Sequence, residues 1–178
     1  HTETIATATA LVASKADVSI IGIGQGDNRP LLTVGTLTTA LISITGAGVL
    51  FANMRIANSI DACVYVVSVT GNGCVLRDLE IIDGAAANAE NVIHCTTDRC
   101  VLDNIRIISN TGGTQGDSAF HLAGCDDMVI RNCHVFGGDW ADGLIQNETT
   151  TCTNILIDHC SFQTVATENI LTAWLANA

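Results

Sequence analysis

The sequence contains very few basic, aromatic or conformationally rigid residues. Lys15 is the single lysine and Pro30 the single proline, and aromatic side chains make up 4% of the 178 residues. With a net charge of −11, the chain offers no basic face for nucleic acid or for an anionic membrane surface. It also has no run of about 20 apolar residues, the length that a membrane-spanning helix needs. Neither nucleic acid nor a membrane is therefore expected as a partner.

The residues that the chain does contain suit a narrow core made of strands. Hydrophobic residues make up 48% of the sequence and are mainly Val, Ile, Leu, Ala and Cys. β-Branched residues favour strands, and the scarcity of proline leaves the backbone N–H groups available for strand ladders. The length predicts one domain, residues 1–178.

A short motif recurs five times along the chain. Each copy has a polar centre, with apolar residues four and two positions before it and one and three positions after it. Successive centres are separated by 25, 26, 28 and 27 residues. A fixed period in this range indicates a repeat architecture. The centres are Asn53, Asp78, Asn104, Asn132 and His159.

The spacing inside each copy predicts two short strands that meet at a corner. Apolar residues alternate on both sides of the centre, which is the period of a strand. Asn tolerates the left-handed backbone conformation that a sharp corner needs. If the copies stack as neighbouring strands, Asp103 faces both Arg77 and Arg131, and such cross-strand pairs contribute about 0.2–1 kcal/mol each. The repeats are therefore predicted to be coils that pair in parallel.

The predicted fold is all-β, a right-handed parallel β-helix in the form of a single-stranded solenoid of about six to seven coils. Residues 1–16 are expected to form an N-terminal cap, with Thr4–Ala16 as a short helix or an irregular lid. Residues 17–48 are expected to form irregular first coils, in which Gly22 takes the corner position. Residues 49–178 are expected to form the regular coils, each with a second strand before the corner motif.

Several of the eight cysteines fall in the same inward columns as the aliphatic residues. Cys74 and Cys100 stand four residues before motif centres, and Cys133 and Cys160 stand one residue after them. A thiol in such a place packs as a small hydrophobic side chain. The cysteines are therefore predicted to be reduced and mostly interior, and not an extracellular disulfide framework. Their closest spacings also lack the tight pairs of a zinc knuckle.

Three carboxylates are the strongest catalytic candidates. Asp117 and Asp142 are one coil apart, so stacking would separate them by about 5 Å, as in a retaining glycosidase. Asp139 is close in sequence, and the neighbouring Trp140 could stack on a sugar. The same residues have a structural interpretation, because Asp is a common turn residue after a Gly-rich loop and a loop Trp can anchor a subunit contact. The structural interpretation is favoured, and no catalytic residue is assigned.

Two other groups of residues have the chemistry of metal ligands. Asp126 and Asp127 form a carboxylate pair at a turn, which is either a calcium site or, the favoured interpretation, a solvated turn. His94 and His121 are 27 residues apart and are predicted to stack on adjacent coils. Two histidines without a third ligand do not make a metal site. No metal and no cofactor are therefore predicted.

The corner pattern Val-x-Leu/Ile-x-Asn-x-x-Ile resembles the right-handed parallel β-helix of the pectate-lyase-like superfamily over about residues 17–175. The resemblance implies the fold, but it says little about function. Lyases of that superfamily use a basic residue and usually calcium, whereas this chain has one lysine. The galacturonase-type signatures, such as Gly-Asp-Asp and Gly-His-Gly, are also absent.

A second resemblance covers the N-terminal region. His1-Thr-Glu-Thr-Ile5 followed by Val18–Pro30 is similar to a group of β-helix proteins encoded by tailed bacteriophages. A Leu-Pro-Gly-type segment precedes the His-Thr-Glu-Thr in that group and is missing here, so the chain is expected to be part of a longer one. Members of the group are usually virion-associated or uncharacterised, so the resemblance implies a phage particle.

The expected function is structural and non-catalytic: a capsid decoration or surface protein, or the shaft of a tail appendage, in a virion assembled in the host cytoplasm. The expected partners are other virion proteins and further copies of the chain, with a trimer as one option. The alternatives are a carbohydrate-depolymerising tailspike-type glycosidase domain and a non-catalytic module that binds a host-surface glycan. Trp174 and Leu175 cannot both face a narrow core. Ile170–Ala178 is therefore predicted to be covered by another subunit, by further chain or by the viral shell.

Overall fold

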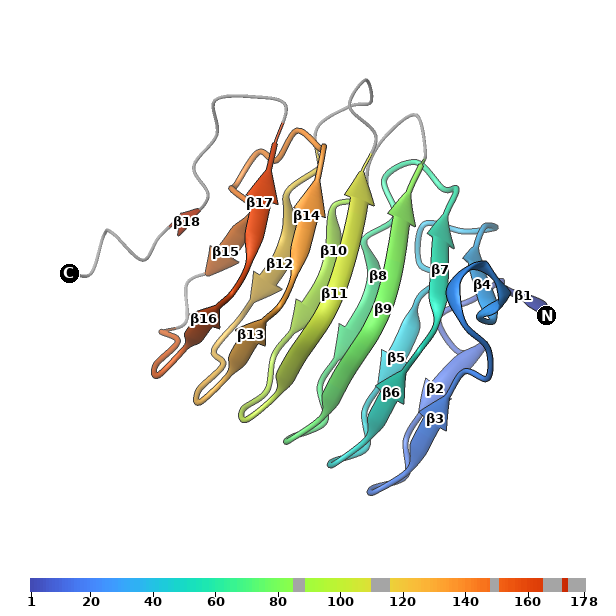
Figure 1. Ribbon diagram of the computed structural model, residues 1–178, viewed down its shortest axis with the longest axis horizontal. Helices are drawn as coiled ribbons and strands as arrows, with labels where there is room; N and C mark the ends of the chain where they lie inside the picture. The colour runs from blue at the N-terminus through green and yellow to red at the C-terminus, as the bar shows by residue number, and fades with distance from the viewer. Residues whose placement is uncertain (85–88, 110–115, 148–150, 165–170, 173–178) are drawn as a thin grey trace.

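A computed structural model describes residues 1–84, 89–109, 116–147, 151–164 and 171–172 of the chain. They form a parallel β-solenoid of about six turns, which confirms the predicted all-β fold (Figure 1). The first sheet contains β1 (Thr2–Ile5), β3 (Ser19–Ile21), β4 (Leu31–Val34), β6 (Leu50–Ala52), β7 (Arg55–Asn58), β9 (Val75–Asp83), β11 (Val101–Ser109), β13 (Val129–Arg131), β14 (His134–Phe136), β16 (Leu156–Asp158) and β17 (Ser161–Gln163). The second contains β2 (Leu11–Ala13), β5 (Ile42–Ile44), β8 (Tyr65–Val69), β10 (Asn91–Cys95), β12 (Ser118–Leu122), β15 (Ile145–Asn147) and β18 (Leu171–Thr172).

The strand register agrees with the columns read from the sequence. In the first sheet Leu102 pairs with Leu76 on one side and with Ile130 on the other. Asp103 likewise faces Arg77 and Arg131 across parallel strands. The side chains of Asp103 and Arg131 form an ion pair with an N–O distance of 2.9 Å, whereas the nearest carboxylate recorded for Arg77 is that of Asp78, at 3.7 Å.

The predicted corner residues have the left-handed backbone conformation. Their φ angles lie between +49° and +57°. Gly22 occupies the same corner of the first coil, because Ile21 is in register with Ala52, but its φ is not positive. A second column of left-handed residues lies five positions before the first, with φ between +54° and +67°, and marks another corner of each coil. Its members are Asp17, Gly48, Gly73, Arg99, Asp127 and Asn154.

The core lies between the two sheets and is made of the predicted inward columns. In the three coils centred on Asp78, Asn104 and Asn132, the residues of the four apolar columns have at most 1% of their surface exposed. Leu76, Leu102 and Ile130 therefore share one core, as predicted. The last described coil differs, because the corresponding residues are only partly buried there: Ile155, Ile157, Cys160 and Phe162.

The cysteines are part of this core. All eight have free thiols; Cys152 and Cys160 are partly exposed and the other six are buried. Burial raises the pKa of Cys100 to about 11 and that of Cys133 to about 12, which keeps these thiols protonated at neutral pH. The prediction of reduced, mostly interior cysteines agrees with this arrangement.

Thr4–Ala16 was expected to be a short helix or an irregular lid, but residues 1–16 instead provide β1 and β2, which pair with β4 and β5 and extend both sheets by one strand. The described residues contain one helical turn, a 3-10 turn at Gly26–Asn28, and no helix with the length and hydrophobicity of a membrane span. The prediction for Ile170–Ala178 falls almost wholly outside the described residues, which include Leu171 and Thr172 of this segment.

Candidate functional site

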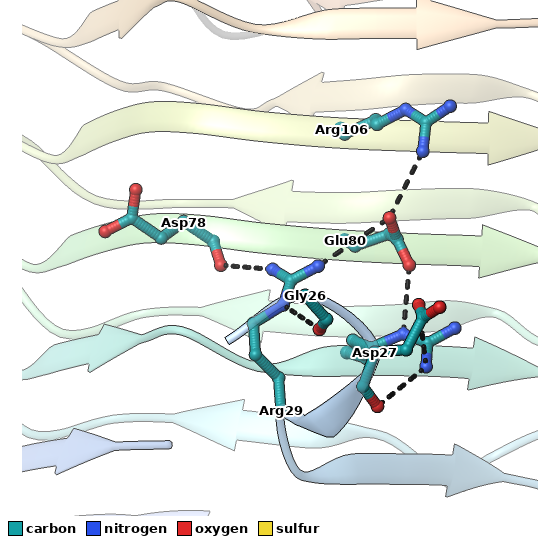
Figure 2. Close-up of polar contacts among 7 residues, drawn as sticks. Gly26, Asp27, Arg29, Asp78, Glu80 and Arg106 are labelled. Carbon is teal, nitrogen blue, oxygen red and sulfur yellow. Dashed lines mark hydrogen bonds and ion pairs between the residues drawn. The ribbon is translucent and has the colours of Figure 1, made fainter. Parts of the chain in front are cut away.

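A loop over residues 24–30 crosses the outer surface of the first sheet and makes polar contacts with two of its coils. The loop contains the 3-10 turn η1 (Gly26–Asn28) and lies in front of the strands in Figure 2. Asn53 holds its start, because the amide Nδ2 donates to the carbonyl oxygens of Gly22 and Gly24 at 2.7 and 3.0 Å. Arg29 holds its end by donating through Nη1 to the carbonyl oxygen of Asp78 at 3.1 Å, across 49 residues of sequence.

Glu80, on β9, is the acceptor around which three arginines gather. Its carboxylate lies 3.0 Å from Arg55 Nε, 3.2 Å from Arg106 Nη1 and 3.6 Å from Arg29 Nη2. Figure 2 shows Glu80 between Arg106 of the next strand and Arg29 of the loop. The Glu80 side chain is 14% exposed. The carboxylate of Glu80 is therefore occupied by ion pairs with three arginines.

A pocket of about 550 Å³ opens between this loop and the sheet. Its volume is within the range of about 300–1,000 Å³ that is usual for small-ligand sites. It is lined by residues of the loop, by corner residues of three successive coils, and by the ion-paired residues Glu80 and Arg106. The lining residues are Gly24, Gln25, Gly26, Arg29, Asn53, Asp78, Leu79, Glu80, Asn104 and Arg106.

Hydrogen-bonding groups of the pocket keep capacity beyond their internal contacts. Asn104 donates through Nδ2 to Asp78 Oδ1 at 2.7 Å, but an amide has a second N–H and two acceptor sites on its oxygen. Arg106 has five N–H donors, and its side chain is 52% exposed. The Arg106 guanidinium also lies over the ring of Phe136, at 5.5 Å from the centroid. An aromatic side chain of the next coil thus lies beside the pocket residue Arg106.

The catalytic candidates Asp117 and Asp142 lie on adjacent coils, as predicted. The backbone N–H of Asp142 donates to the carbonyl oxygen of Asp117 at 3.0 Å. Burial, and secondly the charge of Asp142, raises the pKa of the Asp117 carboxyl, while His121 lowers it. The side chain of Asp142 accepts a hydrogen bond from Gln146 Nε2 at 3.0 Å. The structure therefore brings the carboxylates near each other and also shows the turn contacts of the structural interpretation.

Trp140 does not have the exposure that a sugar platform or a subunit anchor needs. Its side chain is fully buried and belongs to the core, although it lies in a loop. Gly138 makes room for it, because a Cβ at that position would lie 2.4 Å from Trp140 Cε2. Trp140 therefore stabilises the turn that carries Asp139 and Asp142, and both expectations for an exposed ring were wrong.

The remaining candidate residues form contacts between coils. Asp126 Oδ1 accepts hydrogen bonds from the N–H and the hydroxyl of Thr153, at 2.8 and 2.7 Å. Asp127 Oδ1 accepts one from Asn154 Nδ2 at 3.0 Å. These carboxylates organise a turn, and no group of three or more metal-ligating side chains occurs within the described ranges.

The two histidines occupy adjacent coils, as predicted. His94 is in register with His121, and their ring centroids are 4.8 Å apart. Tyr65 is in register with Asn91 and not with His94, but its ring stacks on that of His94 with a centroid distance of 4.1 Å. The three rings form a ladder on the second sheet, and such stacking supports the register of neighbouring coils.

The pocket at the 24–30 loop was not predicted from the sequence. The pairing of Arg55, Glu80 and Arg106 follows the coil period, but the position of Arg29 depends on how a turn folds back over the sheet. The available signal was the unusual concentration of glycine in Gly22–Gly26, which permits the backbone to approach the corner residues closely. A Cβ on Gly22 would lie 2.1 Å from the carbonyl oxygen of Asn53.

Comparisons of the chain with protein-family models, with curated proteins and with solved structures gave no match.

Proposed function

We propose that this chain is a non-catalytic structural component of a phage virion, either a capsid decoration or surface protein or the shaft of a tail appendage. The resemblance of His1–Ile5 and Val18–Pro30 to β-helix proteins of tailed bacteriophages supports the particle. The contacts of the polar side chains support the structural role. Its partners are other virion proteins and further copies of itself, and a trimer is one arrangement to test.

The observation that carries this proposal is that the conspicuous polar residues join one coil to the next. At the corners, Asn104 donates to Asp78 at 2.7 Å and Asn132 donates to Asp103 at 2.8 Å. Each of these bonds links residues one coil apart. Repeated side-chain ladders make a stiff rod, which is the property that a shaft or a surface protein needs.

The last described coil supports assembly with a further surface. Ile155, Ile157 and Phe162 of this coil are partly exposed, whereas their counterparts Met128, Ile130 and Val135 one coil earlier are at 0% exposure. Apolar residues beside a strand edge favour contact with another chain or with further coils.

Purified virions of the phage that encodes the chain test the proposal. Mass spectrometry should detect the protein in intact particles, and antibody labelling in electron micrographs should place it at repeated positions on the capsid or tail. Light scattering of the isolated protein should give the mass of a homo-oligomer. A protein that is absent from purified particles and present only in lysates would overturn the proposal.

A second candidate function is that of a tailspike-type glycosidase that depolymerises carbohydrate. The stacking of Asp117 on Asp142, together with the raised pKa of the Asp117 carboxyl, favours it. Release of reducing ends from capsular or lipopolysaccharide glycans would support this function if it is lost in both Asp117→Asn and Asp142→Asn. Activity that survives both substitutions would exclude these carboxylates as the catalytic pair.

A further inference from the structure

We propose that the pocket beneath the 24–30 loop binds a neutral oligosaccharide. This goes beyond the structural role, because the pocket lies on the outer surface of the first sheet. It is not at the end of the solenoid, where contacts with other chains are proposed. It is also separate from the Asp117 and Asp142 pair, which lies beside the second sheet.

The charge of the pocket argues for a neutral ligand. Four of its lining residues are ionisable: Arg29 and Arg106 are positive, and Asp78 and Glu80 are negative. The two signs cancel, while the chain as a whole has a net charge of −11. An anion would meet the two carboxylates and a cation would meet the two guanidinium groups. A neutral molecule incurs neither repulsion.

The hydrogen-bonding pattern argues for a ligand with many hydroxyl groups. Arg106 offers donors, the carboxylate of Asp78 offers acceptors, and the amide of Asn104 offers both. A sugar hydroxyl donates one hydrogen bond and accepts two, so it matches a surface on which donors and acceptors alternate. Asn104 and Asp78 are already fixed to each other at 2.7 Å, and Arg106 is fixed to Glu80 at 3.2 Å. The ligand therefore meets groups whose positions are set before it binds.

The surface beside the pocket argues for more than one sugar unit. Phe136, on β14, lies one coil beyond Arg106, and the guanidinium of Arg106 lies over its ring. A sugar ring has an apolar face that can pack against an aromatic side chain and a guanidinium plane. One sugar in the pocket and a second near Arg106 and Phe136 would follow the direction in which the coils stack.

Two matched pairs of variants test the site. Asn104→Gly removes a lining amide while glycine still accepts the left-handed φ of +52°. Asn132→Gly is its control, because Asn132 has a φ of +53°, makes the same type of bond to Asp103, and does not line the pocket. Arg106→Gln is paired in the same way with Arg131→Gln, a similarly exposed arginine in an ion pair one coil away.

The probes are an array of neutral oligosaccharides, with trigalacturonate and inorganic phosphate as charged competitors. Hits are measured by saturation-transfer NMR and isothermal titration calorimetry on the full chain. We expect a neutral oligosaccharide to bind, and its Kd to rise about tenfold in Arg106→Gln and about three- to tenfold in Asn104→Gly, with both controls unchanged. The proposal is overturned if no neutral glycan binds, if a charged probe binds better, or if the control variants lose as much affinity as the pocket variants. Circular dichroism of all four variants separates loss of binding from loss of folding.

Discussion

Substitution of Asp83 tests how the solenoid accommodates a buried charge. Its carboxylate has no exposed surface and accepts three hydrogen bonds: from Asn58 Nδ2 at 2.8 Å, from the N–H of Ala89 at 3.0 Å and from Ser109 Oγ at 3.4 Å. Asn58, Asp83 and Ser109 are in register on successive coils, so the contacts form a polar ladder.

The structure predicts the size of the effect. In Asp83→Ala the two shorter bonds lose their acceptor, and each buried donor left unsatisfied costs about 1–3 kcal/mol, partly offset because no charge is then buried. The expected loss of unfolding free energy is about 2–4 kcal/mol. Asp83→Asn keeps one acceptor oxygen but points its amide N–H toward one of the donors that the carboxylate had accepted from. Its unfolding free energy should therefore be about 1–3 kcal/mol lower than that of the wild type.

The pH dependence gives a sharper test, because two carboxylates of the first sheet have pKa shifts of opposite direction. Burial raises the pKa of Asp83 above its ordinary value of 3.8, despite the hydrogen bonds that lower it. Its contribution to stability is thus fully present below the unfolded-state pKa and is lost as the pH rises through the folded-state pKa. The hydrogen bond from Asn132, and secondarily Arg131, lowers the pKa of Asp103, whose contribution is present above 3.8 and is lost as the pH falls.

Urea denaturation followed by circular dichroism, at a series of pH values, measures both effects. Relative to the wild type, the deficit of Asp83→Asn should shrink as the pH rises. The deficit of the control Asp103→Asn should grow as the pH rises and stay below about 1 kcal/mol, because that pair is partly exposed. The reasoning is refuted if the two variants show the same sign, or if Asp83→Asn is as stable as the wild type throughout.

Three further predictions concern the arginine cluster, the buried tryptophan and the thiols. Glu80→Gln removes the negative charge and one of the two acceptor oxygens that three arginines share, and it should lower the unfolding free energy by about 1.5–3 kcal/mol in urea denaturation; an unchanged midpoint would contradict this. Gly138→Ala adds a Cβ against Trp140 at a φ of +82° and should lower the unfolding free energy by about 2–4 kcal/mol. It should also alter the near-ultraviolet circular dichroism of the tryptophans, and an unchanged spectrum would contradict the packing. Without reductant, all eight thiols should react with Ellman's reagent in denaturant, but only the partly exposed Cys152 and Cys160 should react promptly in the native protein; fewer than about six thiols in denaturant would show disulfides.

The fold could be predicted because every repeat has the same types of residue at the same positions relative to its centre. The inward columns and the left-handed corners at Asn53, Asp78, Asn104, Asn132 and His159 follow from alternation and from the backbone preference of Asn. The second corner column was missed, although Gly48, Gly73 and Asn154 are residues that favour it. Arg99 occupies the same place with a φ of +59° and hides the pattern.

The site was harder to predict, because it depends on contacts between segments far apart in the sequence. The bond from Arg29 to the carbonyl oxygen of Asp78 crosses two coils, and the sequence carries no periodic signal for a loop that folds back over a sheet. Trp140 was misread for a related reason: alternation does not apply in a turn, and the space that Gly138 leaves decides the direction of the ring. Asp117 and Asp142 were placed correctly because they obey the coil period.

The central claim is that each coil turns at a left-handed corner residue beside an inward-facing column. The most direct test places glycine and valine in turn at the buried position Ile130 and at the corner position Asn132. Ile130 is fully buried and Asn132 has a φ of +53°. The measurement is the unfolding free energy of four variants in urea. Asn132→Gly should lose no more than about 1 kcal/mol, and Asn132→Val more than about 2 kcal/mol, because a β-branched residue resists the left-handed conformation. Ile130→Val should lose about 0.5–1.5 kcal/mol and Ile130→Gly more than about 3 kcal/mol, because a cavity opens in the core. A slip of one residue in the register would place Asn132 in a strand, where Val is preferred to Gly, and would turn Ile130 outward, so that both of its variants would lose little. A reversed order at Asn132, or a small loss in Ile130→Gly, would contradict the account.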